Sequence, residues 1–140
     1  MSRISYVNGM YIPHGQANLH IEDRGVQFGD GVYIVVACYK GSLIDLDRHL
    51  DRLEHYCESV RIELPLSRQI LPFIAQEMVR KNRLKNGGIF VQVTRGQAKR
   101  QHAFPDDVVP ASLIMTANPT TLHVGSADLP QVHVITTRDT

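Results

Sequence analysis

The segment from Glu22 to Tyr33 constrains the fold more than any other part of the chain. It contains Gly25, Gly29 and Gly31 and leads directly into a β-branched run. Glycine is needed where the backbone takes positive φ or another group comes close, and β-branched runs favour strands. Loops held by a strand are where binding residues concentrate. We therefore expect a shaped loop that presents the Tyr33 ring at the head of a buried strand. The alternative is a plain tight turn between two strands.

Short β-rich runs on both sides of this segment predict an antiparallel sheet. Asn8-Gly9 is a strong hairpin signal because both residues tolerate positive φ. Lys40-Gly41 turns the chain back in the same local way, and local connections of this kind join antiparallel strands. Pro13 ends its strand or places it at an edge. The expected strands cover residues 4–7, 10–12, 32–39, 42–44, 89–94, 113–116 and 132–136.

Two amphipathic patterns predict two helices. Asp45 or Asp47 can cap the first, and the second starts near Ser67 and stops at Asn86-Gly87-Gly88. The apolar stripes recur at three- and four-residue steps; they are Leu46, Leu50, Leu53, Cys57 and Val60 in the first helix, and Ile70, Phe73, Ile74, Glu77 and Met78 in the second. The prediction is a single α+β domain over residues 1–140, a mainly antiparallel sheet of about six strands with two helices packed on it.

The composition narrows the class of protein. The chain has 140 residues, 43% hydrophobic and 21% charged, which are globular values. A net charge of +1 argues against nucleic acid or acidic lipid as a partner. Cys38 and Cys57 are too few for a disulfide scaffold, and the N-terminus has no apolar signal core. No apolar run is long enough for a membrane span. We expect a reduced, cytoplasmic protein with no nucleic-acid or membrane partner.

Metal and hydrolase chemistry find little support. His49 and His55 stand six residues apart, which is not one helix face. The compact run His20-Ile21-Glu22-Asp23 lacks a second cluster to complete a metal site. Neither the serine-hydrolase motif nor the phosphate-binding loop motif occurs. We expect no metal.

A basic cluster after the strand at 89–94 predicts an anion-binding pocket. It comprises Arg95, Lys99, Arg100 and His102, and an arginine fork matches a carboxylate or a phosphate. Tyr33 could supply a neutral donor at the same site. Arg52, on the polar side of the first helix, could supply a further one or form a surface ion pair with Asp51 or Glu54. The alternative is a solvated basic loop with no ligand.

Three parts of the chain resemble the class IV (fold type IV) pyridoxal-phosphate aminotransferases. The first is the glycine segment, Glu22–Tyr33, and the second is Leu46–Leu53. The third combines Phe90–Gly96 with Arg100–Pro105 and is similar to D-amino acid (D-alanine) aminotransferases in particular. The matching segments follow in the family's order and spacing across essentially the whole chain.

The resemblance implies a homodimeric enzyme that uses pyridoxal 5'-phosphate to move an amino group between a D-amino acid and a 2-oxo acid, such as pyruvate or 2-oxoglutarate. By residue-for-residue correspondence, Arg52 would hold the cofactor phosphate. Tyr33, Arg100 and His102 would trap the substrate α-carboxylate, and the family residues matching Arg100 and His102 reach into the other subunit. Clamping the carboxylate fixes which Cα–H bond is aligned for reaction, an orientation effect that lowers the barrier.

The resemblance also implies what lies outside the chain. In the family, the lysine that forms the Schiff base follows a segment matching Thr137-Arg138-Asp139-Thr140, so we expect it beyond Thr140 and assign no catalytic residue within the chain. The larger cofactor-binding domain is expected there too. The chain is thus predicted to be the truncated N-terminal half of a two-domain enzyme, inactive by itself and binding the cofactor weakly or not at all.

Other functions stay open. Within the family, the glycine segment and Arg52 suit a branched-chain L-amino acid aminotransferase, an amine transaminase or an aminodeoxychorismate lyase equally well, and Arg100-Gln101-His102 favours the D-amino acid branch. From another class, a non-catalytic α+β domain could bind an anion or a partner protein. A nucleic-acid-binding loop is disfavoured by the near-neutral charge and the few aromatics around Arg100.

Overall fold

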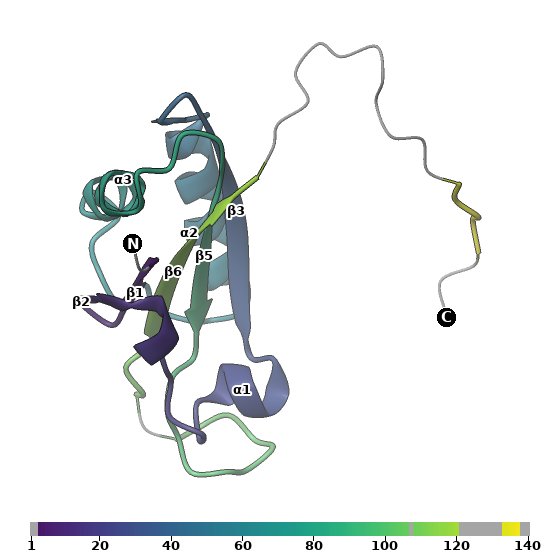
Figure 1. The fold of residues 1–140 in the computed structure, drawn as a ribbon. Helices are drawn as coiled ribbons and strands as arrows, with labels where there is room; N and C mark the ends of the chain where they lie inside the picture. The colour runs from purple at the N-terminus through teal and green to yellow at the C-terminus, as the bar shows by residue number, and fades with distance from the viewer. Residues whose placement is uncertain (1–2, 107, 121–132, 138–140) are drawn as a thin grey trace.

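A six-stranded antiparallel sheet forms the body of the described structure, a computed structural model that covers residues 3–106, 108–120 and 133–137 (Figure 1). The order across the sheet is β2-β1-β6-β5-β3-β4. The strands are β1 (Ile4–Val7), β2 (Met10–Pro13), β3 (Gly31–Tyr39), β4 (Ser42–Leu43), β5 (Gly87–Thr94) and β6 (Ser112–Pro119). The helices are the 3-10 turn η1 (His14–Gln16), α1 (Arg24–Phe28), α2 (Leu46–Ser59) and α3 (Leu71–Asn82). The predicted α+β class is confirmed.

Helices α2 and α3 pack on one face of the sheet, and their contact with it forms the core (Figure 1). Alternate residues of β3 point into this core, as the period of a strand requires. The residues between them, Tyr33 and Val35, lie on the opposite face, 60% and 49% exposed. The core is drawn mainly from β3, β5, β6, α2 and α3, through Ile34, Val36, Cys38, Leu50, Leu53, Cys57, Ile74, Met78, Ile89, Val91, Val93, Leu113 and Met115.

The two hairpin turns predicted at Asn8-Gly9 and Lys40-Gly41 are confirmed. Asn8 (φ 45°) and Gly9 (φ 95°) take positive φ between β1 and β2, and Pro13 ends β2 at the sheet edge. Lys40 and Gly41 take positive φ between β3 and β4 in the same manner. In both turns the glycine adopts this backbone conformation without steric cost.

The strand predicted at 132–136 is wrong where it can be compared. Val132 lies outside the described residues, and residues 133–137 form no strand. Val134 and Ile135 are 81% and 94% exposed. Strand propensity is expressed against a neighbouring strand and a packed face, and these residues pair with no strand in the described part of the chain.

The buried face of α3 differs from the predicted stripe by one position. Met78 and Ile74 are buried as expected, but Ile70 and Phe73 are exposed. The helix starts at Leu71, with Pro72 in its first turn, and Leu71, Ala75 and Val79 complete the buried face. Glu77 is half-buried and pairs with Arg80 and Lys81 instead of packing in the core.

The start of α2 and the end of α3 both differ from the predicted capping and stop signals. Asp45 is the N-cap of α2, but it has φ 50° and its side chain makes no capping bond. Asp47 lies in the first turn, where a negative charge suits the helix dipole. Helix α3 ends at Asn82, with Arg83 in the left-handed region, and so stops before the predicted signal at Asn86-Gly87-Gly88. Gly87 and Gly88 belong to β5.

Both cysteines of the core are free thiols. Burial, with a smaller contribution from Glu54 and Glu58, raises the pKa of Cys57 to about 11. Burial also raises the pKa of Cys38. A raised pKa keeps the thiol protonated, whereas the thiolate is the reactive form. Both buried side chains therefore serve packing.

None of the helices in the described residues combines the length and the apolar character needed to cross a bilayer.

Neighbouring residues of α3 allow a test of its orientation. Replacing Ile74, which is 7% exposed, by alanine leaves a cavity in the core, and we expect the free energy of unfolding to fall by about 2–4 kcal/mol. Replacing Phe73, which is 71% exposed, should change it by less than about 0.5 kcal/mol. Urea denaturation of both variants measures the difference. A larger loss for Phe73→Ala than for Ile74→Ala would contradict the orientation seen here.

Candidate active site

The glycine segment folds around a short helix, α1, and is therefore not the loop that we predicted. Asp23 is its N-cap, and the Asp23 carboxylate accepts a hydrogen bond from the Gly25 N–H at 2.8 Å. Gly29 ends the helix in the left-handed region with φ 66°. An aspartate N-cap followed by a glycine stop is a recognisable helix signal. Here the two residues are so close in sequence that the same pattern also reads as a turn.

Asp23 also fastens α1 to the sheet. It is 1% exposed, and its second carboxylate oxygen accepts hydrogen bonds from Thr94 Oγ1 at 3.0 Å and Ser112 Oγ at 2.7 Å. Gly25 permits this close approach, since a Cβ atom there would lie 2.3 Å from Thr94 Cγ2. The helix is thus fixed against the ends of β5 and β6.

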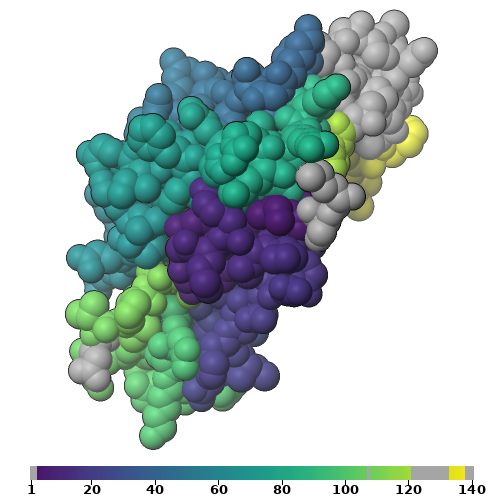
Figure 2. All heavy atoms as spheres, turned by 60° about the vertical axis from the view of Figure 1, so that its left-hand side comes forward, coloured from purple at the N-terminus to yellow at the C-terminus, as the bar shows by residue number. Residues whose placement is uncertain are grey.

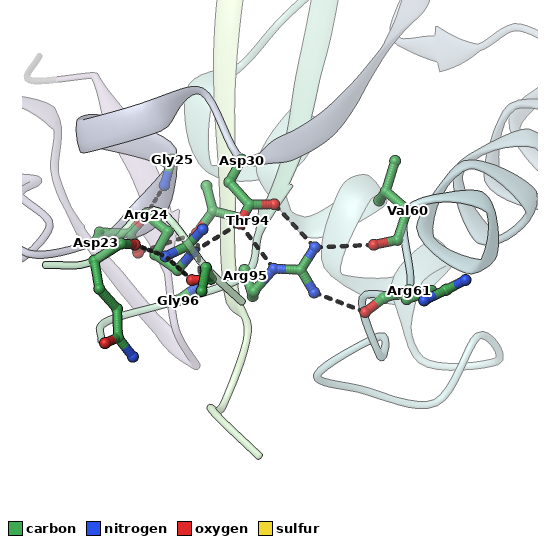
Figure 3. Close-up of polar contacts among 11 residues, drawn as sticks. Asp23, Arg24, Gly25, Asp30, Val60, Arg61, Thr94, Arg95 and Gly96 are labelled. Atoms are coloured by element: carbon green, nitrogen blue, oxygen red, sulfur yellow. Dashed lines mark hydrogen bonds and ion pairs between the residues drawn. The ribbon is translucent and has the colours of Figure 1, made fainter. Parts of the chain in front are cut away.

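Asp30 holds the next layer of contacts together (Figure 3). Its Oδ2 accepts from Arg24 Nε at 2.7 Å and from Arg95 Nε at 2.8 Å, and its Oδ1 accepts from Arg95 Nη2 at 3.0 Å. The Arg95 guanidinium also donates to the carbonyls of Val60 at 2.9 Å and Arg61 at 2.8 Å, just past α2. Burial would raise the pKa of Asp30, but Arg95 and Arg24 outweigh it and hold that pKa below its ordinary value.

Arg95 therefore does not belong to an anion-binding cluster, as the sequence suggested. Its side chain is 12% exposed, as is that of Asp30, and its donors point to Asp30 and to two backbone carbonyls. A basic residue next to a basic loop is naturally assigned to that loop, and the distant acid that neutralises it cannot be found from spacing.

Arg24 links this network to the loop that follows β5. It is 3% exposed, and its Nη1 donates to the carbonyl oxygens of Gln101 at 2.8 Å and Ala103 at 3.3 Å. These two residues flank His102. The loop gathers with α1 at the same end of the molecule, below β3 in Figure 1 and at the lower end of Figure 2.

Arg100 and His102 meet on a common neighbour, the ring of Phe28. The Arg100 guanidinium carbon lies 5.5 Å from the ring centroid, and the His102 ring centroid lies 5.4 Å from it. The Arg24 guanidinium carbon lies 4.8 Å from the same centroid. The structure therefore brings together two of the four predicted binding residues.

Tyr33 and Arg52 have other partners. Tyr33 stacks on Phe90 of β5, with ring centroids 5.2 Å apart, and is exposed on the open face of the sheet. Arg52 is exposed on α2 and donates from Nη2 to Nδ1 of His49 at 2.9 Å. It forms no ion pair within the described residues, and Asp51 pairs with Arg68 at 2.7 Å instead.

A cavity on the described part of the molecule lies apart from these residues. It has a volume of about 630 Å³ and is lined partly by Tyr6, Leu19, His20, Pro65 and Leu66. None of the four predicted binding residues lines it. We therefore place the candidate carboxylate-binding residues, Tyr33, Arg100 and His102, at the open face of the sheet and the loop after β5, not in this cavity. Arg52 lies apart from them on α2.

The Asp30 network gives a prediction for stability and its pH dependence. In Asp30→Asn, Arg24 and Arg95 lose their anion, and we expect a loss of about 2–4 kcal/mol in the free energy of unfolding at pH 7. Because folding lowers the pKa of Asp30, its stabilisation is present above the ordinary pKa and is lost as pH falls through the lowered one. Denaturant unfolding between about pH 6 and pH 2.5 should therefore show a smaller acid-induced decline for Asp30→Asn than for the unaltered chain.

The control for this variant is Asp47→Asn, which removes the same charge from an 85% exposed carboxylate paired with Arg68. We expect a change of less than about 1 kcal/mol. An equal loss of unfolding free energy in the two variants would contradict the conclusion that the buried Asp30 contacts stabilise the fold more than an exposed ion pair does.

Comparison with known proteins shows the family to which the chain belongs. The amino-transferase class IV family model matches residues 31–139. A D-alanine aminotransferase of Listeria innocua is 38% identical over 112 residues, which are 79% of this chain and 38% of that protein. The matched part of the chain thus spans little more than a third of the length of that relative.

Solved structures share the fold. A branched-chain amino acid aminotransferase from Escherichia coli superimposes with a TM-score of 0.81 at 20% identity, covering 94% of this chain and 44% of that one. A 4-amino-4-deoxychorismate lyase from Pseudomonas aeruginosa gives a TM-score of 0.64 at 30% identity, covering 82% and 39%. The sheet, its two covering helices and the match over residues 31–139 lead to one conclusion: the chain belongs to the class IV aminotransferases.

Proposed function

We propose that this chain is the small N-terminal domain of a D-amino acid aminotransferase, which exchanges an amino group between a D-amino acid and a 2-oxo acid. The observation that carries the proposal is the 38% identity to D-alanine aminotransferase over 79% of the chain. The family match also spans Tyr33, Arg52, Arg100 and His102. In this proposal the lysine that forms the Schiff base and the larger cofactor-binding domain belong to a longer protein that contains this chain.

In this proposal Tyr33, Arg100 and His102 bind the substrate carboxylate. The Arg100 fork can donate two parallel hydrogen bonds to a carboxylate, and the His102 ring beside it and the Tyr33 hydroxyl can each add one. All three side chains are exposed, so a ligand can reach them. The ring of Tyr33 contacts Phe90, whereas Arg100 and His102 contact the ring of Phe28. In this proposal, as the family resemblance implies, Arg100 and His102 reach the site of the other subunit, and the trap is completed in a homodimer.

Arg52 would hold the phosphate of pyridoxal 5'-phosphate. Its guanidinium is exposed, forms no ion pair with a carboxylate within the described residues, and donates from Nη2 to Nδ1 of His49. A donor set of this kind fits a phosphate, which arginine binds by charge-assisted hydrogen bonds. When bound, the cofactor supplies the electron sink for the reaction. The free thiols of Cys38 and Cys57 suit the reducing cytoplasm in which we place the enzyme.

A second candidate is an aminodeoxychorismate lyase, favoured by the 30% identity to the Pseudomonas aeruginosa enzyme over 82% of the chain. The branched-chain aminotransferases share the fold at lower identity. Fold alone does not choose among these reactions.

The substrate assay that separates the candidates uses the full-length protein that contains this chain. We expect turnover of D-alanine with 2-oxoglutarate, because the relatives that match most of the chain act in that branch by name. L-leucine with 2-oxoglutarate and 4-amino-4-deoxychorismate are tested in parallel. Turnover confined to either of these two would replace the proposed function by the corresponding alternative.

The role of Arg52 has its own test in the same protein. Arg52→Ala removes the proposed phosphate donor, and the dissociation constant for pyridoxal 5'-phosphate, followed by absorbance titration, should rise about 10- to 100-fold. Arg48→Ala is the matched control, since it removes an exposed arginine one turn earlier on α2. An equal effect of the two substitutions would contradict a specific role for Arg52.

A further inference from the structure

The ring of Phe28 lies where three cationic or ionisable side chains converge. Arg100 lies 5.5 Å and Arg24 4.8 Å from its centroid, and the His102 ring lies 5.4 Å away, tilted by 53°. Arg24 is buried and fixed by Asp30, whereas Arg100 and His102 are exposed. Phe28 is therefore the surface on which two exposed loop side chains rest.

An exposed arginine on a loop loses rotamer freedom when it binds a ligand, and that loss opposes binding. Contact with the face of an aromatic ring attracts a guanidinium and restricts its positions before the ligand arrives. Rigid support of this kind raises affinity by preorganisation without adding a contact to the ligand. The effect on Arg100 and His102 is shared, because one ring touches both.

The position of Phe28 is itself well determined. It is the last residue of α1, whose start is fixed by Asp23 and whose Arg24 is fixed by Asp30. Arg24 also holds the backbone on both sides of His102 through the carbonyls of Gln101 and Ala103. The backbone of the loop is thus set by Arg24, and its recognising side chains are set by Phe28.

We propose that Phe28 is a positioning residue for carboxylate recognition, holding Arg100 and His102 in the arrangement that receives the substrate. The proposal rests on the proposed function for its substrate, and the contacts that carry it belong to this chain. Phe28 does not touch the reacting atoms; it acts through the two side chains that it supports.

The competing interpretation is that Phe28 only fills space between α1 and the loop. That role requires an apolar side chain of similar size, whereas positioning requires an aromatic face. Leucine supplies the first property without the second, and tyrosine retains both. The pair Phe28→Leu and Phe28→Tyr therefore separates the two interpretations.

Steady-state kinetics of the full-length enzyme with D-alanine provide the main test. In Phe28→Leu we expect the KM to rise about threefold to tenfold, from the loss of the aromatic contact. The kcat should change less than about twofold, because an interaction made equally in the ground and transition states affects KM alone. Phe28→Tyr should restore the KM to within about twofold of the unaltered enzyme, because the aromatic face is retained.

Val26→Ala is the matched control, since Val26 lies on the same short helix and is 60% exposed. It should leave both constants unchanged. An unchanged KM in folded Phe28→Leu, or the same KM defect in Phe28→Tyr, overturns the proposal. If Phe28→Leu fails to fold, Phe28→Met takes its place under the same criteria.

A second measurement does not depend on the reaction. In the 140-residue chain, the NMR order parameter of the Arg100 Nε–H bond should fall in Phe28→Leu and stay near its original value in Phe28→Tyr. An unchanged order parameter in Phe28→Leu overturns the positioning role whatever the enzyme does. Loss of order together with no turnover of any amino acid would instead refute the proposed function and leave the contact established.

Discussion

The hydrogen bonds to the Asp30 carboxylate hold together the end of the molecule that carries the candidate site. The carboxylate accepts from two largely buried arginines at once, and each arginine carries the connection to another part of the fold. Arg95 reaches the residues that follow α2, and Arg24 reaches the loop after β5. Unpaired buried charges are costly, so neither arginine could occupy its place without the acid between them. The carbonyls that accept their remaining donors complete the compensation.

Local signals predicted the parts of the fold that local geometry decides. The Asn8-Gly9 hairpin follows from which residues tolerate positive φ. The face of α3 does not, because Phe73 and Ile74 are adjacent and equally apolar, and one step along a helix turns the side chain by about 100°. Which of the two is buried depends on how the helix docks on the sheet. Strand propensity alone is also insufficient. Residues 133–136 are rich in β-branched side chains, but they pair with no strand in the described part of the chain.

The candidate site likewise has one part that the sequence predicts and another part that depends on the fold. The resemblance predicts Tyr33, Arg52, Arg100 and His102 as binding residues, because each lies in a motif that the sequence displays. The contacts of Arg95 and Phe28 were not predicted, because they join residues that are far apart in the sequence and come together only in the fold. Arg95 was assigned to the basic cluster, and only its contact with Asp30 shows otherwise. Phe28 lies in the glycine segment, and nothing in spacing links it to a loop more than seventy residues away, whereas the ring contact does.

The way in which the loop is held bears on how one fold supports several reactions. Arg24 grips the loop through the backbone oxygens of Gln101 and Ala103, and any residue offers such an oxygen. The side chains of Arg100 and His102 are not needed for that grip and remain available for recognition. A fold shared by aminotransferases and a lyase can therefore change what it recognises by replacing side chains on an anchored backbone. In this chain the ring of Phe28 adds a constraint on the side chains themselves, so a change at position 100 or 102 would need a partner that still packs against an aromatic face.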